Sequence, residues 1–162
     1  MVDVVDKITR SRMMAGIKGK DTKPELALRS ALHRQGLRFR LHAKKLPGRP
    51  DMIFPKYRAA VQVHGCFWHR HTNCAFCTTP SSNTRFWKTK FDETVERDAL
   101  KLETLRNLGW RVAVVWECSV KDKGADAISR RLAKWLRSKR SFMEVSSKFI
   151  VQASHRRGGR NK

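Results

Sequence analysis

The run RVAVVW, residues 111–116, decides the fold of this chain. Five of its six residues are apolar, and three of these are valines. An uninterrupted apolar run of this length is typical of a strand buried on both faces in the middle of a sheet. The residues before it, from about Asn83 to Leu108, have helical spacing and end at Gly109. We therefore expect a long helix followed by a central strand.

Three shorter apolar runs precede that helix, and each is a predicted strand. They are separated by PGRP and PKY, which are typical turn sequences. The runs are LRFRLH (37–42), MIF (52–54) and AAVQVHG (59–65).

A helix is expected on either side of this strand region. Thr22 stands three residues before Glu25, which is the spacing of a capping box, and Pro24 falls in the first turn. Gly36 ends this helix after about 13 residues. A last helix is indicated by the apolar positions Ile128, Leu132, Trp135 and Leu136. The order helix, three strands, helix, strand, helix predicts one layered α/β domain.

The composition indicates the kind of partner. The 162 residues, 40% of them hydrophobic, are enough for one domain with a real core. Lysine and arginine number 36 against 14 acidic residues, a formal charge of +22, which favours a nucleic acid partner. A basic protein of ribosomal type, or a solvated surface, is the other reading. No run of about 18 apolar residues occurs, and the start MVDVVDKITR has no apolar segment resembling a signal peptide, so we expect a reducing cytosol.

One carboxylate interrupts the apolar stripe of the long helix. Asp98 completes the helical spacing of Phe91, Val95, Leu102 and Leu105, and is therefore expected to face the core. A buried carboxylate needs a fixed partner. That partner could be an arginine in a structural salt bridge, or a histidine that Asp98 orients as a general base.

Two further carboxylates have both a structural and a functional reading. Asp51, in GRPDMIF, stands at the start of a predicted strand, where it could bind a hard divalent cation or cap a turn. Glu25 could serve the site, although a capping-box glutamate already has a structural reason to be present.

The segment HGCFWHRHTNC, residues 64–74, predicts a metal site. Zinc prefers four nitrogen or sulfur ligands in a tetrahedron. Two sets satisfy that rule equally: Cys66, His71, Cys74 and Cys118, or Cys66, Cys74, Cys77 and Cys118. Either set closes the metal's coordination, so the zinc is expected to be structural, and both sets leave His64 and His69 free.

Phe67 and Trp68 lie between these candidate ligands. One of them could be buried. If both are exposed on so basic a protein, they are suited to act as an apolar wedge between DNA base pairs.

Taken together, several motifs resemble the very short patch repair (Vsr) endonuclease family. They are SRMM (11–14), LPGRPD (46–51), HGCFWHRH (64–71), TRFW (84–87), NLGWRV (107–112) and VWEC (115–118). The resemblance spans about residues 3–140. It implies a restriction-endonuclease-like three-layer α/β domain with a central mixed sheet and a structural zinc. It also implies an enzyme that nicks duplex DNA 5′ of the thymine in T:G mismatches left by deamination of 5-methylcytosine.

The resemblance also implies roles for individual residues. Asp51 and the backbone carbonyl of Val63 would hold Mg²⁺, and His64 and Glu25 would support the hydrated metal. His69, paired with Asp98, would be the general base. Zinc would be held by Cys66, His71, Cys74 and Cys118, which leaves Cys77 outside the family's ligand set. Phe67 and Trp68 would intercalate, with Met14 approaching from the other groove. The usual lysine of restriction-like nucleases is replaced by Gln62 and His64.

These implications set the expected organisation and its alternatives. We expect a DNA-contacting arm at 1–20, a catalytic domain at 21–150 and a basic tail at 151–162. The enzyme should be a cytoplasmic, nucleoid-associated monomer that binds no membrane, with T:G-mismatched DNA as substrate and mismatch-repair proteins as candidate partners. One alternative is a zinc-stabilised DNA-binding module without catalysis. The other is a restriction endonuclease that cuts both strands of undamaged DNA.

Overall fold

The computed structural model describes residues 6–15 and 19–147, apart from the side chains of Arg10, Met13 and Met14. A five-stranded mixed sheet forms its centre, in the order β1-β2-β3-β4-β5. The strands are β1 (Arg40–Leu41), β2 (Met52–Phe54), β3 (Ala59–His64), β4 (Arg111–Trp116) and β5 (Phe142–Val145). β1, β2 and β3 pair antiparallel, whereas β3, β4 and β5 pair parallel. RVAVVW is thus an inner strand of the sheet, as predicted.

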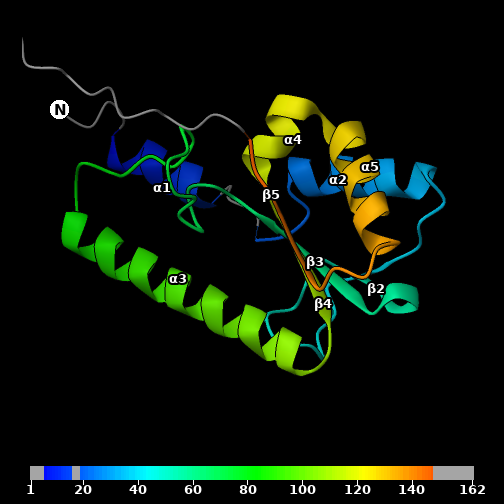
Figure 1. Cartoon of the computed structure of the whole chain (residues 1–162). Helices are drawn as coiled ribbons and strands as arrows, with labels where there is room; N and C mark the ends of the chain where they lie inside the picture. The colour runs from blue at the N-terminus through cyan, green and yellow to red at the C-terminus, as the bar shows by residue number, and fades with distance from the viewer. Residues whose placement is uncertain (1–5, 16–18, 148–162) are drawn as a thin grey trace, which may run out of the picture.

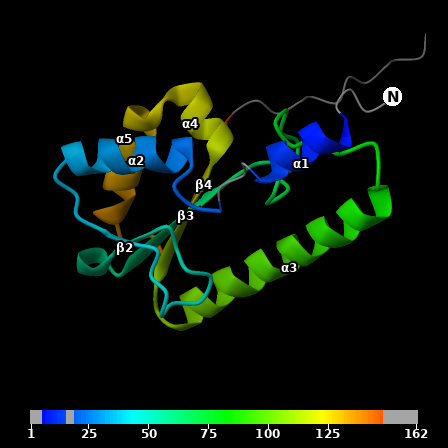
Figure 2. The same ribbon diagram turned by 180° about the vertical axis from the view of Figure 1, so that it is seen from behind.

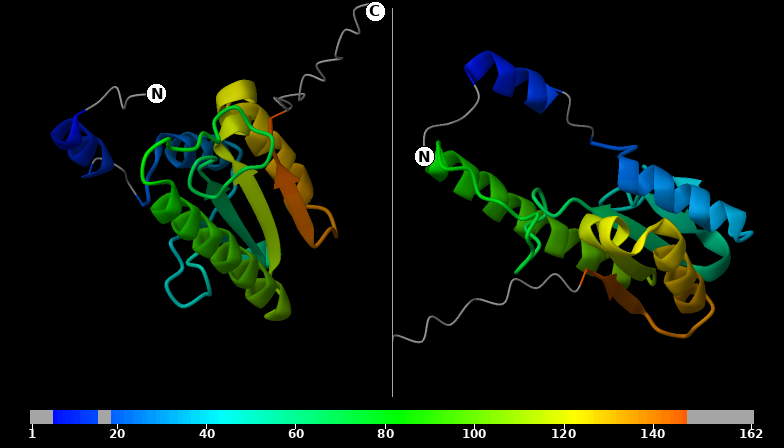
Figure 3. Two further views of the ribbon diagram at one scale, coloured as in Figure 1. Left: turned by 90° about the vertical axis from the view of Figure 1, so that its left-hand side faces the viewer. Right: turned by 90° about the horizontal axis from the view of Figure 1, so that it is seen from above.

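Helices cover both faces of the sheet. Figures 1 and 2 show α2 (Lys23–Arg34), α4 (Glu117–Lys123) and α5 (Ala125–Leu136) on one side and α3 (Thr84–Asn107) on the other. The fifth helix, α1 (Lys7–Ala15), stands apart from these layers in Figure 3, and a 3-10 turn, Pro55–Tyr57, joins β2 to β3.

The alternation of strand residues explains how both faces are buried. Val61 and Val115 belong to the larger core, under α2 and α5, where they pack with Leu32 and Leu132. Their neighbours in the strands point to the opposite face, where Val112 packs in a smaller core with residues that include Leu105 of α3. All of β3, and β4 after Arg111, are therefore buried, because neither face of either strand is left to solvent.

The structure differs from the sequence prediction at several elements. The predicted strand at 37–42 is reduced to Arg40–Leu41, and the strand Phe142–Val145 was not predicted. The predicted last helix is α5, and the short helix α4 before it was not predicted; Gly124, with φ +81°, breaks the helical path between the two. The N-terminal arm contains α1, a helix whose weak apolar period gave no signal. The predicted tail at 151–162 lies outside the described residues.

Candidate active site

A cleft of about 1250 Å³ opens where β3 ends and contains most of the residues predicted to be functional. Its walls are the start of α2, the segment around 42–51, the loop after β3, and one side of α3. Several cations line it: Lys20, Lys44, Arg49, Lys90 and Lys101. A basic cleft of this kind is suited to the phosphates of a nucleic acid.

His69 and Asp98 face each other in this cleft. His69 Nδ1 lies 2.5 Å from Asp98 Oδ2, and both side chains are mostly buried. Burial alone would raise the pKa of Asp98, but its hydrogen bond with His69 and the nearby charges lower it. Among the described residues, the hydrogen-bond partner of Asp98 is thus a histidine, and the arginine salt bridge considered from the sequence is not formed.

The apolar stripe that singled out Asp98 is less regular than predicted. Phe91 and Leu105 are buried, but Val95 is 45% exposed. The first half of α3 extends beyond the sheet in Figure 1, and Phe91 in that half is buried in contact with Phe67 of the loop after β3. Asp98 instead meets the loop that follows β3.

His64 supports the ring of His69. The two rings stack with centroids 4.0 Å apart, and His64 Nε2 lies 3.0 Å from Gln62 Oε1. Because an amide oxygen only accepts, the proton of His64 is assigned to Nε2. Burial, followed by the nearby His69, lowers the pKa of His64 to about 3, so His64 is neutral at physiological pH.

Asp51 sits at the start of β2 with its carboxylate toward β3. Its Oδ2 accepts a hydrogen bond from the backbone N–H of Val63 at 2.7 Å. Burial raises the pKa of Asp51 to about 6, despite this hydrogen bond. A carboxylate that is difficult to ionise without a cation suits a metal ligand. Since N–H and C=O of one strand residue point to the same edge, the Val63 carbonyl also faces the Asp51 side.

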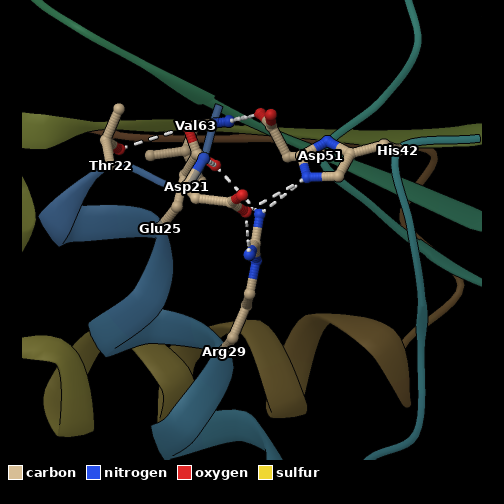
Figure 4. Close-up of polar contacts among 7 residues, drawn as sticks. All are labelled: Asp21, Thr22, Glu25, Arg29, His42, Asp51 and Val63. Carbon is tan, nitrogen blue, oxygen red and sulfur yellow. Dashed lines mark hydrogen bonds and ion pairs between the residues drawn. The ribbon is translucent and has the colours of Figure 1, made fainter. Parts of the chain in front are cut away.

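Glu25 is more constrained than the capping box suggested. Its Oε2 accepts hydrogen bonds from the backbone N–H of Asp21 and from Arg29, and its Oε1 accepts one from the Thr22 hydroxyl. Figure 4 shows this network beside Asp51. Glu25 therefore reaches back to the residue before the helix cap, and a buried arginine compensates its charge.

The segment 64–74 brings four candidate metal ligands together. The described residues place ligand atoms of Cys66, His71, Cys74 and Cys118 within 4.8 Å of one another, and Cys77 is not in that group. His71 Nδ1 lies 3.6 Å from Cys66 Sγ and 3.4 Å from Cys118 Sγ. Burial raises the pKa values of both of these thiols. A cation would be needed to keep them as thiolates, so the donor set fits a bound metal.

The tip of the same loop joins an aromatic cluster. Phe67 and Trp68 are both half-buried, so neither sequence reading, one buried or both exposed, describes them fully. Their rings contact each other at 5.0 Å, and Phe67 also contacts Trp87 and Phe91 of α3. Arg70 lies over the Phe91 ring at 4.0 Å. Phe67, Trp68 and Trp87 line the cleft.

Several residues of the site were not assigned from the sequence. Trp87 had a signal, since it stands four residues before Phe91 on one helix face, but only the motif TRFW was noted. Arg29 and His42 had none, because their contacts join α2 to a loop 13 residues away. Met14, a predicted DNA contact, has a side chain outside the described residues. Across the described part of the chain, no helix combines the length and apolar character that a membrane span requires.

Comparison with known proteins gives consistent matches. A family model described as DNA mismatch endonuclease Vsr matches residues 2–75. The chain is 40% identical to the DNA mismatch endonuclease Vsr of Escherichia coli over 153 residues, 93% of this chain and 97% of that protein. It is 46% identical over 125 residues to the type II nicking enzyme V.XorIIP of Xanthomonas oryzae pv. oryzae, which is 77% of this chain and 91% of that enzyme. The type II nicking enzyme V.NmeAIP of Neisseria meningitidis serogroup A is 42% identical over 123 residues, which is 76% of this chain and 87% of that enzyme.

Proposed function

The chain belongs to the Vsr family of DNA mismatch endonucleases and is an endodeoxyribonuclease, and on this premise we propose that it nicks duplex DNA 5′ of the thymine in T:G mismatches with the help of Mg²⁺. The repair of deaminated 5-methylcytosine would be its role. The single observation that carries the proposal is the His69–Asp98 pair in the same cleft as Asp51.

His69 is the proposed general base. With its Nδ1–H donated to Asp98, the Nε2 atom keeps its lone pair and can take a proton from the attacking water. Asp98 then stabilises the imidazolium that forms. His64, stacked on His69 and held neutral, keeps the ring in place without adding a positive charge.

Asp51 and the backbone carbonyl of Val63 would hold Mg²⁺, and the bound ion would supply Lewis-acid polarisation of the scissile phosphate and stabilise charge on the leaving oxygen. The oxygen donors and the raised pKa of Asp51 support this role. Glu25 and His64 would orient water around the metal, because both line the cleft beside Asp51. The cleft's lysines and arginines would hold the DNA strands flanking the site.

Cys66, His71, Cys74 and Cys118 would hold a structural zinc. These ligands come from the loop after β3 and from the start of α4, so a metal there would tie the catalytic loop to the end of β4. Four protein ligands leave no open position, which keeps this site out of the chemistry.

Phe67 and Trp68 would insert at the mismatch. They sit at the tip of the loop between His64 and His71, with Trp87 and Phe91 packed behind them. Inserting an aromatic wedge costs a few kcal/mol of base unstacking, less at a mismatch than in a perfect duplex. Met14 is proposed as the opposing contact.

The mixed five-stranded sheet and the family together favour a restriction-endonuclease-like fold. One chain carries a complete set of proposed catalytic groups, so we propose that a monomer, acting on bacterial DNA in the cytoplasm and on the nucleoid, suffices. Mismatch-repair proteins remain candidate partners. A DNA-binding module without catalysis would leave the His69–Asp98 pair unexplained, and a double-strand cutter would need two such sites acting together.

A supercoiled plasmid bearing one T:G mismatch tests the proposal. Wild-type protein with Mg²⁺ should convert it to the open circular form, whereas Asp51→Asn should leave it supercoiled while binding it with similar affinity. Linear plasmid as the first product would favour the restriction-enzyme alternative. Absence of cleavage with any divalent metal would contradict the proposed reaction.

A further inference from the structure

A charged cluster lies beside Asp51, and of its members only Glu25 has a role in the chemistry proposed above. It consists of Asp21, Glu25, Arg29 and His42 (Figure 4). Arg29 is only 8% exposed and Glu25 only 3%. Glu25 and His42 line the cleft, whereas Arg29 and Asp21 are not part of its wall.

The Arg29 guanidinium contacts every other member of this cluster. Its Nη1 lies 2.6 Å from Asp21 Oδ1, and its Nη2 lies 2.9 Å from Glu25 Oε2 and 3.2 Å from His42 Nε2. Arg29 Nε is buried and has no hydrogen-bond partner within the described part of the chain. The ion pairs with Asp21 and Glu25 therefore orient the Arg29 side chain, although one of its N–H donors, Nε, has no partner there.

The other three residues of the cluster, Asp21, Glu25 and His42, offer a donor set that could hold a metal ion. Ligand atoms of Asp21, Glu25 and His42 all lie within 4.8 Å of one another. Two carboxylates and an imidazole are a legitimate donor set for divalent ions such as Mn²⁺. Removing the charge of Arg29 would also leave Glu25 as a buried charge without compensation, which is strongly unfavourable.

We propose that Arg29 is a built-in cation that occupies the place of a divalent ion among Asp21, Glu25 and His42. It confines the catalytic metal to Asp51 and fixes Glu25 beside it. Arginine suits this task because its charge is permanent and its fork reaches two carboxylates at once. Arg29 is thus a positioning residue acting through Glu25 and His42. The statement that Arg29 confines the catalytic metal to Asp51 rests on the proposed function. The statement that Arg29 occupies the place of a divalent ion does not.

Replacing Arg29 in an Asp51→Asn background separates Mn²⁺ binding at the Arg29 cluster from Mn²⁺ binding at the proposed Asp51 site. Arg29→Met keeps an unbranched side chain and removes the charge. The double variant should bind one more Mn²⁺ per chain than Asp51→Asn alone, in titrations without DNA, and its Tm should rise on adding Mn²⁺. Mn²⁺ held at the cysteine site is common to both proteins and cancels in the comparison.

Two controls show whether the acquired ion occupies the predicted place. Adding Asp21→Asn to the double variant should weaken the acquired Mn²⁺ binding at least tenfold. Arg29→Lys in the same background retains a positive charge and should acquire no ion.

The proposal is overturned if folded Arg29→Met binds no additional Mn²⁺, or if Arg29→Lys acquires the same ion. If Arg29→Met is unfolded without metal, refolding on addition of Mn²⁺ supports the proposal and failure to refold contradicts it. Arg29→Gln, which keeps a neutral hydrogen-bond donor, is a second variant, and it should likewise bind one additional Mn²⁺ per chain. Plasmid nicking with Arg29 intact tests the role of Asp51 separately, so the two hypotheses fail independently.

Discussion

His69 Nδ1 lies 2.5 Å from Asp98 Oδ2, although 29 residues separate them in sequence. His69 belongs to the loop after β3 and Asp98 to the middle of α3. The pair therefore connects the end of the sheet to the helix that covers one of its faces. This arrangement orients the imidazole, and in the proposed mechanism its second nitrogen, Nε2, takes the proton.

If His69 and Asp98 serve one proton-transfer step, the losses of nicking rate caused by replacing each of them will not be additive in free energy. His69→Ala and Asp98→Ala should each reduce the single-turnover nicking rate by roughly 10²–10⁴-fold. The double variant should be little slower than the His69→Ala single variant, as expected for residues that act as a unit. Independent roles would instead give losses that multiply. Asp98→Asn, which keeps the shape of the side chain, is the control for folding.

Asp51→Asn should change stability in a pH-dependent way. The folded protein keeps a proton on Asp51 up to about pH 6, whereas an unfolded chain releases it near 3.8. Raising the pH through that window therefore lowers the free energy of unfolding of the wild type. In metal-free buffer the Asn variant should be more stable than wild type by about 1–3 kcal/mol above pH 6, converging near pH 4.

Denaturant unfolding of both proteins across that pH range measures the difference. A stability gap independent of pH would mean that Asp51 ionises normally. Added Mg²⁺ should stabilise the wild type and not the Asn variant, because binding to the folded state alone raises the free energy of unfolding.

The identity of the zinc ligands can be decided by metal content. Cys74→Ser and His71→Ala should lose zinc or bind it weakly, with a large loss of stability, since a structural site contributes its binding energy to folding. Cys77→Ser should keep one zinc per chain and a near-normal Tm. Loss of zinc from Cys77→Ser together with its retention in His71→Ala would establish the all-cysteine alternative.

The aromatic wedge should control selectivity more than general affinity. Replacing both Phe67 and Trp68 with Ala should lower the preference for mismatched over matched duplex, while salt-sensitive binding to matched DNA persists through lysine and arginine. Leu100→Ala, at a 64% exposed apolar residue of α3 outside the cleft, is a matched control. Equal losses on both duplexes would indicate damage to the aromatic cluster rather than lost recognition.

The parts of the fold predicted from sequence are those with strong periodic patterns. RVAVVW was predicted as an inner strand because five of its six residues are apolar, and Gly36 and Gly109 marked real helix ends. β5 escaped prediction because FMEV is short and offers only two fully buried positions. The short helix α4 was missed because its seven residues are too few to show an apolar period.

The site divides in the same way. Asp98 was found from its position on a helix face, although Val95 of the same stripe is exposed. The ligand choice between His71 and Cys77 could not be made from spacing, because spacing does not show which side chain turns inward. Arg29 had no signal in the sequence, and only the folding of His42 and Asp21 toward it reveals the charged cluster.

The central claim, mismatch-specific strand nicking, is tested most directly by mapping cleavage on a panel of end-labelled duplexes. The panel should contain T:G, the other single mismatches, and the matched parent sequences in several flanking contexts. We predict one Mg²⁺-dependent break, 5′ of the thymine of T:G, with the opposite strand intact and the matched duplexes uncut. Equal cleavage of matched and mismatched duplexes, or breaks in both strands, would contradict the account.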